Sequence, residues 1–341
     1  MFSKLSRFSK LVGSNTLRPR KCSQALSIAR ANVEETYGFG RTQLLSETNI
    51  DIFMAKYDTL LLDCDGVVWA NDHVTPINGI ANTVTKLRNY GKKLFFITNN
   101  AIHDRSAYIK KFKDMAGIDL SPDEIFPVTY SSALYVSNII RTDQKAYVLG
   151  SEGLRKELNS LGVQSIGFGP DEDLLSDHPS DLMSQQIDPA VQVVLVSYDI
   201  HFSFNKLFKA VSYLRNPYCM YVATNDTETG VPLGEKHIQP ITGSFVAAVS
   251  AASRRKPTVV GKPHLHLFRC LQGVHSIDPD RTIMIGDSLT TDVPFAVNAG
   301  IDSLLVLSGV STLEDLENPH IQDFPNYLLP SLAHINKMLP R

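Results

Sequence analysis

The 341-residue sequence has few cysteines, almost no net charge and no long apolar run. Its four cysteines are far apart and form no Cys-x-x-Cys or Cys/His spacing, so neither a disulfide framework nor a zinc site is indicated. The formal net charge of -2 provides no general field to attract nucleic acid. No stretch of about 18 apolar residues is present to span a membrane. We therefore expect a globular protein whose partners include neither nucleic acid nor a membrane.

Acidic residues are missing from the N-terminal segment. Before Glu34 the chain has seven basic residues, no acidic one and several serines, which is the composition of a mitochondrial transit peptide. The alternative is a basic tail that is not a targeting signal, which would leave the protein in the cytoplasm. We expect residues 1–40 to direct a fused reporter into mitochondria, and cytosolic fluorescence of the fusion would contradict this.

From residue 57 onward, apolar runs that end in polar residues alternate with segments of helical periodicity. Strands are predicted over 57–65, 92–100, 145–150, 191–198, 218–225, 281–287 and 302–307, and helices over 78–91, 151–162 and 204–216. Strands that are apolar throughout are typical of parallel sheets covered on both faces, which predicts an α/β architecture. In such sheets, ligands bind at the carboxyl ends of the strands. The polar, proline-containing segment 167–189 is predicted to be a loop or short excursion within a second domain.

Two carboxylates end the first predicted strand, where LLLDCDGVVW places Asp63 and Asp65 one residue apart. A desolvated carboxylate pair is costly unless a cation lies between the two groups or one of them keeps a proton. Hard oxygen donors favour Mg²⁺, and Gly66 allows a sharp backbone turn. The pattern alone fits a helix cap or a calcium turn equally well.

Other chemically suitable residues follow in order along the chain. Thr98 ends the strand in ITNN, Lys262 lies in GKP, and Asp287 and Asp292 lie in GDSLTTD after another apolar run. Each alone fits a structural role, as a helix cap, a solvated lysine or a strand-end cap. One hydroxyl, one cation and two more carboxylates, mostly at strand ends, together favour a site for a phosphoryl group.

The ordered motifs DCDG, FFITNN, GKP and GDSLTTD resemble those of the haloacid dehalogenase superfamily of phosphatases. The sequence segments DGVVW, VATN, GSFVAAV and GKPHLHLF resemble those of the eukaryotic p-nitrophenylphosphatase branch, which contains phosphoglycolate phosphatase and pyridoxal phosphatase. The resemblance implies a Rossmann-like core with a parallel sheet, split by a large inserted α/β cap. Here it implies a core of residues 46–142 with 258–341 and a cap of 143–257. It also suggests a homodimer formed through the cap.

The resemblance implies a role for each motif residue. Asp63 would be the nucleophile that forms an aspartyl-phosphate, and Asp65 would be the general acid and base. Mg²⁺ would be held by Asp63, the backbone carbonyl of Asp65 and Asp287. The remaining motif residues would hold the phosphate, with oxygens bound by Thr98, Asn99 and Lys262, and with Asp292 positioning Lys262 or a metal-bound water.

Substrate choice is expected to depend on the cap segment 222–240, where Asn225 could reach a carboxylate or hydroxyl. Pyridoxal-phosphatase-like relatives tend to have a histidine before the proline of this loop, whereas Val231 precedes Pro232 here. We therefore expect 2-phosphoglycolate, with glycerol 3-phosphate and pyridoxal phosphate as alternatives. A non-catalytic binding protein of the same fold is a further alternative, but the presence of both Asp63 and Asp65 favours an enzyme.

Two other features of the sequence favour structural roles. Cys64 alternates in direction with its aspartate neighbours on the predicted strand and is expected to be a small buried filler. Asp199 and His201 are expected to form a hydrogen-bonded pair in the cap, because the core motifs already contain both catalytic carboxylates.

Overall fold

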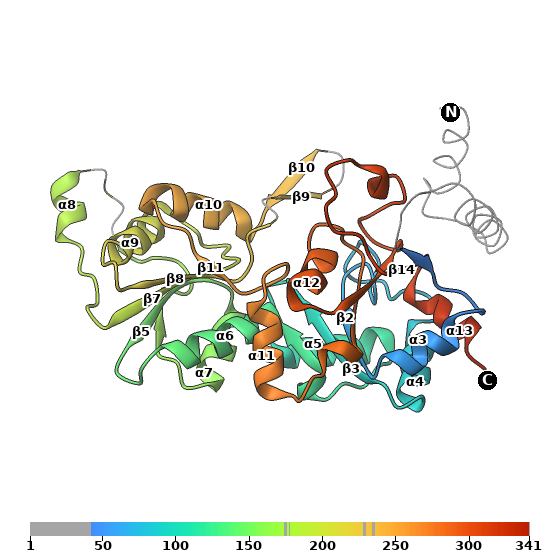
Figure 1. Ribbon diagram of the computed structural model, residues 1–341. Helices are drawn as coiled ribbons and strands as arrows, with labels where there is room; N and C mark the ends of the chain where they lie inside the picture. The colour runs from blue at the N-terminus through green and yellow to red at the C-terminus, as the bar shows by residue number, and fades with distance from the viewer. Residues whose placement is uncertain (1–41, 174–175, 177, 228–229, 234–235, 341) are drawn as a thin grey trace.

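A computed structural model describes residues 42–173, 176, 178–227, 230–233 and 236–340 (Figure 1). The expected transit peptide, residues 1–40, lies outside the described residues. The described chain forms a seven-stranded sheet, a five-stranded sheet and a two-stranded ribbon, with helices packed on the sheets. This α/β architecture with parallel sheets is the predicted fold class. None of the described helices combines the length and the apolar composition needed to cross a bilayer.

The core sheet has the strand order β1-β14-β13-β12-β2-β3-β4, and all its neighbours are parallel. Its strands are β1 Gln43–Leu44, β2 Thr59–Asp63, β3 Lys93–Thr98, β4 Ile125–Pro127, β12 Thr282–Gly286, β13 Asp302–Val306 and β14 Tyr327–Leu329. Strand β2 lies between β12 and β3. Because parallel neighbours end at the same edge of the sheet, the motifs after these three strands meet there.

Helices cover both faces of the core sheet. They are α3 Ile50–Lys56, α4 Ile80–Asn89, α5 Arg105–Lys111, α6 Val128–Ile139, α11 His266–Val274, α12 Asp292–Ala299 and α13 Ile335–Met338, with the π-helical turn Phe112–Ala116 and short 3₁₀ turns at Pro122–Glu124, Pro279–Arg281, Asp315–Glu317 and Leu332–His334. Leu60 and Leu62 pack in one apolar cluster with α3 and α4, whereas Leu61 packs in another with α11 and α12. This alternation explains why β2 is apolar throughout.

The second sheet has the order β11-β8-β7-β5-β6, again entirely parallel. Its strands are β5 Lys145–Leu149, β6 Ser165–Ile166, β7 Val191–Val196, β8 Met220–Ala223 and β11 Thr258–Val259, and its helices are α7 Glu152–Ser160, α8 Pro179–Ser184, α9 Phe204–Leu214 and α10 Thr242–Ser253. Strand β11 extends this sheet two residues beyond the expected boundary at 257. The segment 167–189 connects β6 to β7 and contains the short helix α8.

Two connections join the sheets near the end of β8. Helix α6 follows β4 and contributes Tyr130 to a core cluster and Val136 to a cluster under the second sheet. On the return, the Gly261 amide donates to the Thr224 carbonyl at 2.7 Å. The carboxyl end of β8 is therefore held beside the loop that contains Lys262. The antiparallel ribbon of β9 Gly230–Leu233 and β10 His237–Pro240 follows β8 (Figure 1).

Candidate active site

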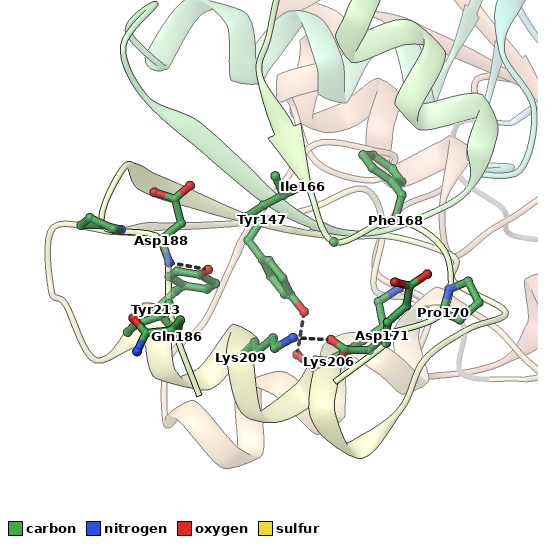
Figure 2. A pocket seen from close by; sticks show the side chains of 14 residues that line it. Tyr147, Ile166, Phe168, Pro170, Asp171, Gln186, Asp188, Lys206, Lys209 and Tyr213 are labelled. Atoms are coloured by element: carbon green, nitrogen blue, oxygen red, sulfur yellow. Dashed lines mark hydrogen bonds and ion pairs between the residues drawn. The ribbon is translucent and has the colours of Figure 1, made fainter. Parts of the chain in front are cut away.

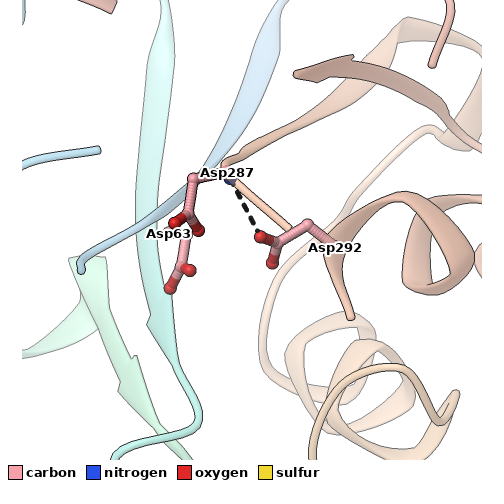
Figure 3. Close-up of side chains that lie close together, drawn as sticks. All are labelled: Asp63, Asp287 and Asp292. Carbon is pink, nitrogen blue, oxygen red and sulfur yellow. Dashed lines mark hydrogen bonds between the residues drawn. The ribbon is translucent and has the colours of Figure 1, made fainter. Parts of the chain in front are cut away.

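Three carboxylates meet at the carboxyl edge of the core sheet. Asp63 ends β2, Asp287 follows the neighbouring strand β12, and Asp292 begins α12. Each offers an oxygen, and these oxygens lie within 4.8 Å of one another (Figure 3). All three residues are buried, with exposed fractions of 8%, 5% and 1% respectively. The structure thus brings together residues that are distant in the sequence, since Asp63 and Asp292 are 229 positions apart.

Burial and mutual repulsion both act against the ionised carboxylates. Burial raises the pKa of Asp63, and the charges of Asp292 and Asp287 raise it further against the opposing effect of Lys262. Burial, followed by the charge of Asp292, also raises the pKa of Asp287 to about 7. A bound cation would favour the ionised form of both groups. Carboxylate oxygens are the donors that hard cations prefer, so this cluster could hold such a cation.

Lys262 lies among these carboxylates. Its Nζ is 2.8 Å from Asp63 Oδ1 and 2.7 Å from Asp292 Oδ1, and its side chain is almost fully buried. Burial alone would lower the pKa of Lys262, but Asp292 and Asp63 outweigh that effect and raise it. The two neighbouring carboxylates therefore favour the charged form of the lysine. With all three carboxylates ionised, this one ammonium group leaves two negative charges, which suits a divalent cation.

Both carboxylate oxygens of Asp292 have partners within the protein. Its Oδ1 pairs with Lys262, while its Oδ2 accepts hydrogen bonds from the backbone amides of Asp287 and Ser288, both at 3.1 Å. These contacts leave the carboxylates of Asp63 and Asp287 as the more open cation donors of the cluster. Of the two partners expected for Asp292, Lys262 or a metal-bound water, the structure places Lys262 in contact with it.

Two glycines enclose the Asp287 carboxylate. A Cβ atom at Gly66, whose φ is +76°, or at Gly309 would overlap this carboxylate. The Val310 amide donates to Asp287 Oδ2 at 2.7 Å, and the Ser308 hydroxyl donates to the Gly66 carbonyl at 2.6 Å. Sequence reasoning missed the 308–310 segment. Its one signal was Gly309, two residues after the end of the predicted strand 302–307, at a position where the backbone approaches closely.

The residues expected to bind phosphate lie at the same edge. Thr98 ends β3 next to β2, is almost fully buried, and accepts a hydrogen bond from the Asn100 amide at 3.1 Å. The Asn99 side chain donates to the Lys262 carbonyl at 2.8 Å and accepts from the Lys262 amide at 2.9 Å. These two hydrogen bonds join the loop after β3 to the loop that contains Lys262. The side chain of Asn99 is therefore engaged with the backbone of Lys262, which leaves the main chain of Asn99 for the expected contact with phosphate oxygens.

Asp65 lies apart from the cluster. Its carboxylate is partly exposed and its Oδ1 is 2.9 Å from Nδ1 of His73. Sequence reasoning did not identify His73, which belongs to no chemical motif. Cys64, between the two aspartates, is buried as expected, and burial raises the pKa of its thiol. Such a thiol is a poor nucleophile.

The two residues expected to determine substrate choice belong to the second sheet and to the ribbon that follows β8. Asn225 follows β8, is 7% exposed, and its Oδ1 accepts a hydrogen bond from the Thr224 hydroxyl at 2.9 Å. The backbone of Val231 lies in β9, opposite Gln239 of β10. The side chain of Val231 is outside the described part of the structure.

A separate cavity of about 540 Å³ lies within the second sheet region (Figure 2). Its lining includes Tyr147, Lys206, Lys209 and Tyr213, and Lys209 pairs with Asp171 at 2.8 Å. The cavity shares no lining residue with the carboxylate cluster. Lys206 and Lys209 are already paired with carboxylates, so the described lining residues offer no free cation for an anionic substrate.

Comparison with known proteins agrees with the motifs and the fold. The family model for haloacid dehalogenase-like hydrolases matches residues 60–164, and a second, HAD hydrolase-like model matches residues 259–335. Glycerol-3-phosphate phosphatase from Rattus norvegicus is 39% identical over 304 residues, which cover 85% of this chain and 94% of the relative. Phosphoglycolate phosphatase 2 from Arabidopsis thaliana is 33% identical over 299 residues, covering 87% and 98% respectively.

A solved structure has the same architecture. The p-nitrophenyl phosphatase from Archaeoglobus fulgidus superposes with a TM-score of 0.70 at 26% identity, over 83% of this chain and 100% of that one. Identity above 30% across most of both sequences, together with the two family matches, establishes common descent with these phosphatases. The chain belongs to the haloacid dehalogenase-like hydrolase family, in the branch that contains these phosphatases.

Proposed function

We propose that this phosphoric monoester hydrolase is Mg²⁺-dependent and acts through an aspartyl-phosphate on Asp63. The observation that carries the proposal is the buried arrangement of Asp63, Lys262 and Asp292 beside Asp287. Asp63 Oδ1 already contacts Lys262 and the Cys64 amide, at 2.8 and 2.7 Å. These contacts leave Oδ2 as the nucleophilic atom.

In the first step, Asp63 Oδ2 attacks phosphorus in line and the bond to the leaving oxygen breaks. Asp65 gives its proton to that oxygen, and in the second step it takes a proton from the water that hydrolyses the acyl phosphate. Thr98, the main chain at Asn99 and Lys262 bind the transferred oxygens. Lys262 is suited to this because Asn99 and Asp292 fix its backbone and its ammonium group.

The cation would be held by the carboxylates of Asp63 and Asp287 and the backbone carbonyl of Asp65. Mg²⁺ fits this set because it prefers oxygen donors and is commonly bound by one or two carboxylates with substrate phosphate. When bound, it would neutralise charge on the phosphoryl group. Burial and neighbouring charge raise the pKa of Asp63 and of Asp287, and a bound cation would oppose both effects and favour the ionised carboxylates.

The proposed substrate is a small, anionic alkyl phosphate, with 2-phosphoglycolate as the first candidate. The absence of a histidine at Val231 disfavours pyridoxal phosphate, and Asn225 offers an amide near the joint between the sheets. Glycerol 3-phosphate is the second candidate. It is favoured by the 39% identity to the rat enzyme named for that substrate, against 33% for the plant phosphoglycolate phosphatase.

The test is phosphate release from 2-phosphoglycolate, glycerol 3-phosphate, pyridoxal 5'-phosphate and p-nitrophenyl phosphate, using protein that lacks residues 1–40. We expect kcat/KM for 2-phosphoglycolate to exceed the others by about a hundredfold, or about 2.7 kcal/mol of transition-state binding. Chelation of Mg²⁺ should abolish release, and its return should restore it. A higher kcat/KM for glycerol 3-phosphate would select the second candidate. No release of phosphate by folded, Mg²⁺-loaded protein would favour the non-catalytic alternative.

A further inference from the structure

We propose that His73 is a positioning residue for the Asp65 carboxyl group. The inference rests on the proposed role of Asp65 as general acid. His73 Nδ1 lies 2.9 Å from Asp65 Oδ1. Within the described part of the chain, no other side chain hydrogen-bonds or pairs with this carboxylate. A general acid with a single side-chain partner depends on that partner for its orientation.

His73 has an unusual backbone conformation. Its φ is +58°, in the left-handed region that few residues other than glycine occupy. Histidine, asparagine and aspartate are tolerated there more often than most side chains. Arg254 is the other non-glycine residue with this conformation in the described chain, and it ends a helix. At His73 the conformation occurs in a turn that returns towards the catalytic strand.

Several hydrogen bonds outside the Asp65 contact fix this turn. The His73 amide donates to the Ala70 carbonyl at 2.9 Å, and Lys111 Nζ donates to the His73 carbonyl at 2.7 Å. Asp72 Oδ1 accepts from the amides of Val74 and Thr75 at 2.9 and 2.8 Å. The backbone from which the ring projects is therefore set by the turn and by helix α5, independently of the carboxylate that the ring contacts.

The start of the turn is also tied to the catalytic loop. The Trp69 amide donates to the Cys64 carbonyl at 2.9 Å, and the Gly66 amide donates to the Trp69 carbonyl at 2.8 Å. Trp69 is fully buried, and Lys111 Nζ lies 4.4 Å from the centre of its ring. After Asp65 the chain therefore passes through the buried residue Trp69 and turns back, so that His73 faces the carboxylate of Asp65.

This geometry gives the two oxygens of Asp65 different roles. With its proton on Nδ1, His73 donates to Oδ1 and fixes the plane of the carboxyl group, which leaves Oδ2 to carry the transferable proton. As the bond between phosphorus and the leaving oxygen breaks, that oxygen keeps the electron pair and takes the proton from Oδ2. The new bond forms between phosphorus and Asp63. His73 itself exchanges no proton in this step.

The test compares two esters of nearly the same shape, p-nitrophenyl phosphate and phenyl phosphate. Nitrophenolate leaves readily without a proton, whereas phenolate is a poorer leaving group and depends on the general acid. The quantity measured is kcat/KM, which reports steps up to departure of the leaving group and excludes hydrolysis of the intermediate. His73→Gly keeps the left-handed turn without the ring. We expect it to lower kcat/KM for phenyl phosphate about tenfold more than for p-nitrophenyl phosphate.

His73→Asn is the matched variant, because asparagine tolerates the left-handed backbone and its amide nitrogen can replace Nδ1 as donor. We expect His73→Asn to restore the ratio of the two kcat/KM values to within about threefold of the parent. If His73→Gly lost kcat/KM equally on both esters, or lost none, the role of His73 would be overturned. In either case turnover by the parent enzyme would leave the proposed function standing. Absence of turnover by the parent enzyme on both esters would overturn both. Thermal unfolding of each variant separates these outcomes from loss of fold.

Discussion

Replacing the nucleophile should remove activity without unfolding the protein. We expect Asp63→Asn to lower kcat by about 10⁴-fold or more, because an amide is a poor nucleophile and a poor Mg²⁺ ligand. The fold should survive, since the substitution keeps the side-chain shape and removes one of three crowded carboxylates. Lys262 would keep its ion pair with Asp292. Phosphate release and thermal unfolding, measured on the same preparation, test both parts.

Asp114→Asn is a suitable control for this experiment. It makes the same chemical change at an exposed carboxylate, which pairs with Lys110 on the protein surface, and we expect it to retain parent kcat. An Asp63→Asn variant that released phosphate at the parent rate would rule out Asp63 as the nucleophile. A variant that lost activity because it had unfolded would instead show that the carboxylate supports the core.

The largest effect on stability is expected in the second sheet region, at Lys206. Its Nζ lies 2.5 Å from Asp199 Oδ2, it also donates to the Gly169 carbonyl at 2.8 Å, and both side chains of the ion pair are 1% exposed. Lys206→Met would leave Asp199 as a buried charge without its partner. Breaking a buried pair in this way costs about 3–5 kcal/mol. The free energy of unfolding, measured by urea titration, should fall by that amount.

Two further variants separate the ion pair from other effects of the substitution. Adding Asp199→Asn to Lys206→Met should recover part of the loss, because asparagine is neutral and its oxygen can still accept from the His201 amide. Lys110→Met breaks an exposed ion pair and should cost less than about 1 kcal/mol. If Lys206→Met cost no more than Lys110→Met, the buried pair would not be a determinant of stability.

The region around Asp199 also shows where local sequence reasoning reaches its limit. Asp199 and His201 were expected to pair with each other. His201 does donate to Asp199, but through its backbone amide, and the charged partner of Asp199 is Lys206 on α9. The hydrogen bond between the two residues is present, but it involves no side-chain atom of His201. The two-residue spacing carried no information on a helix residue that packs against the turn from outside.

The short strands β1, β4 and β14 were likewise not predicted. Each has two or three residues, too few to show a hydrophobic period. They form because neighbouring strands in the sheet provide hydrogen-bond partners. The longer apolar runs were predicted because their composition alone requires burial on both faces.

The sequence by itself determined the α/β class and the ordered set of candidate site residues. It could do so because parallel strands share one carboxyl edge, so residues that end successive apolar runs meet there whatever their distance in the chain. Only the tertiary structure decided which contacts hold each group in place. Asn99 holds the Lys262 backbone, glycines at 66 and 309 make room for Asp287, and His73 reaches Asp65. These contacts depend on backbone conformation and on loops that pack from separate parts of the chain, and a linear pattern does not encode either.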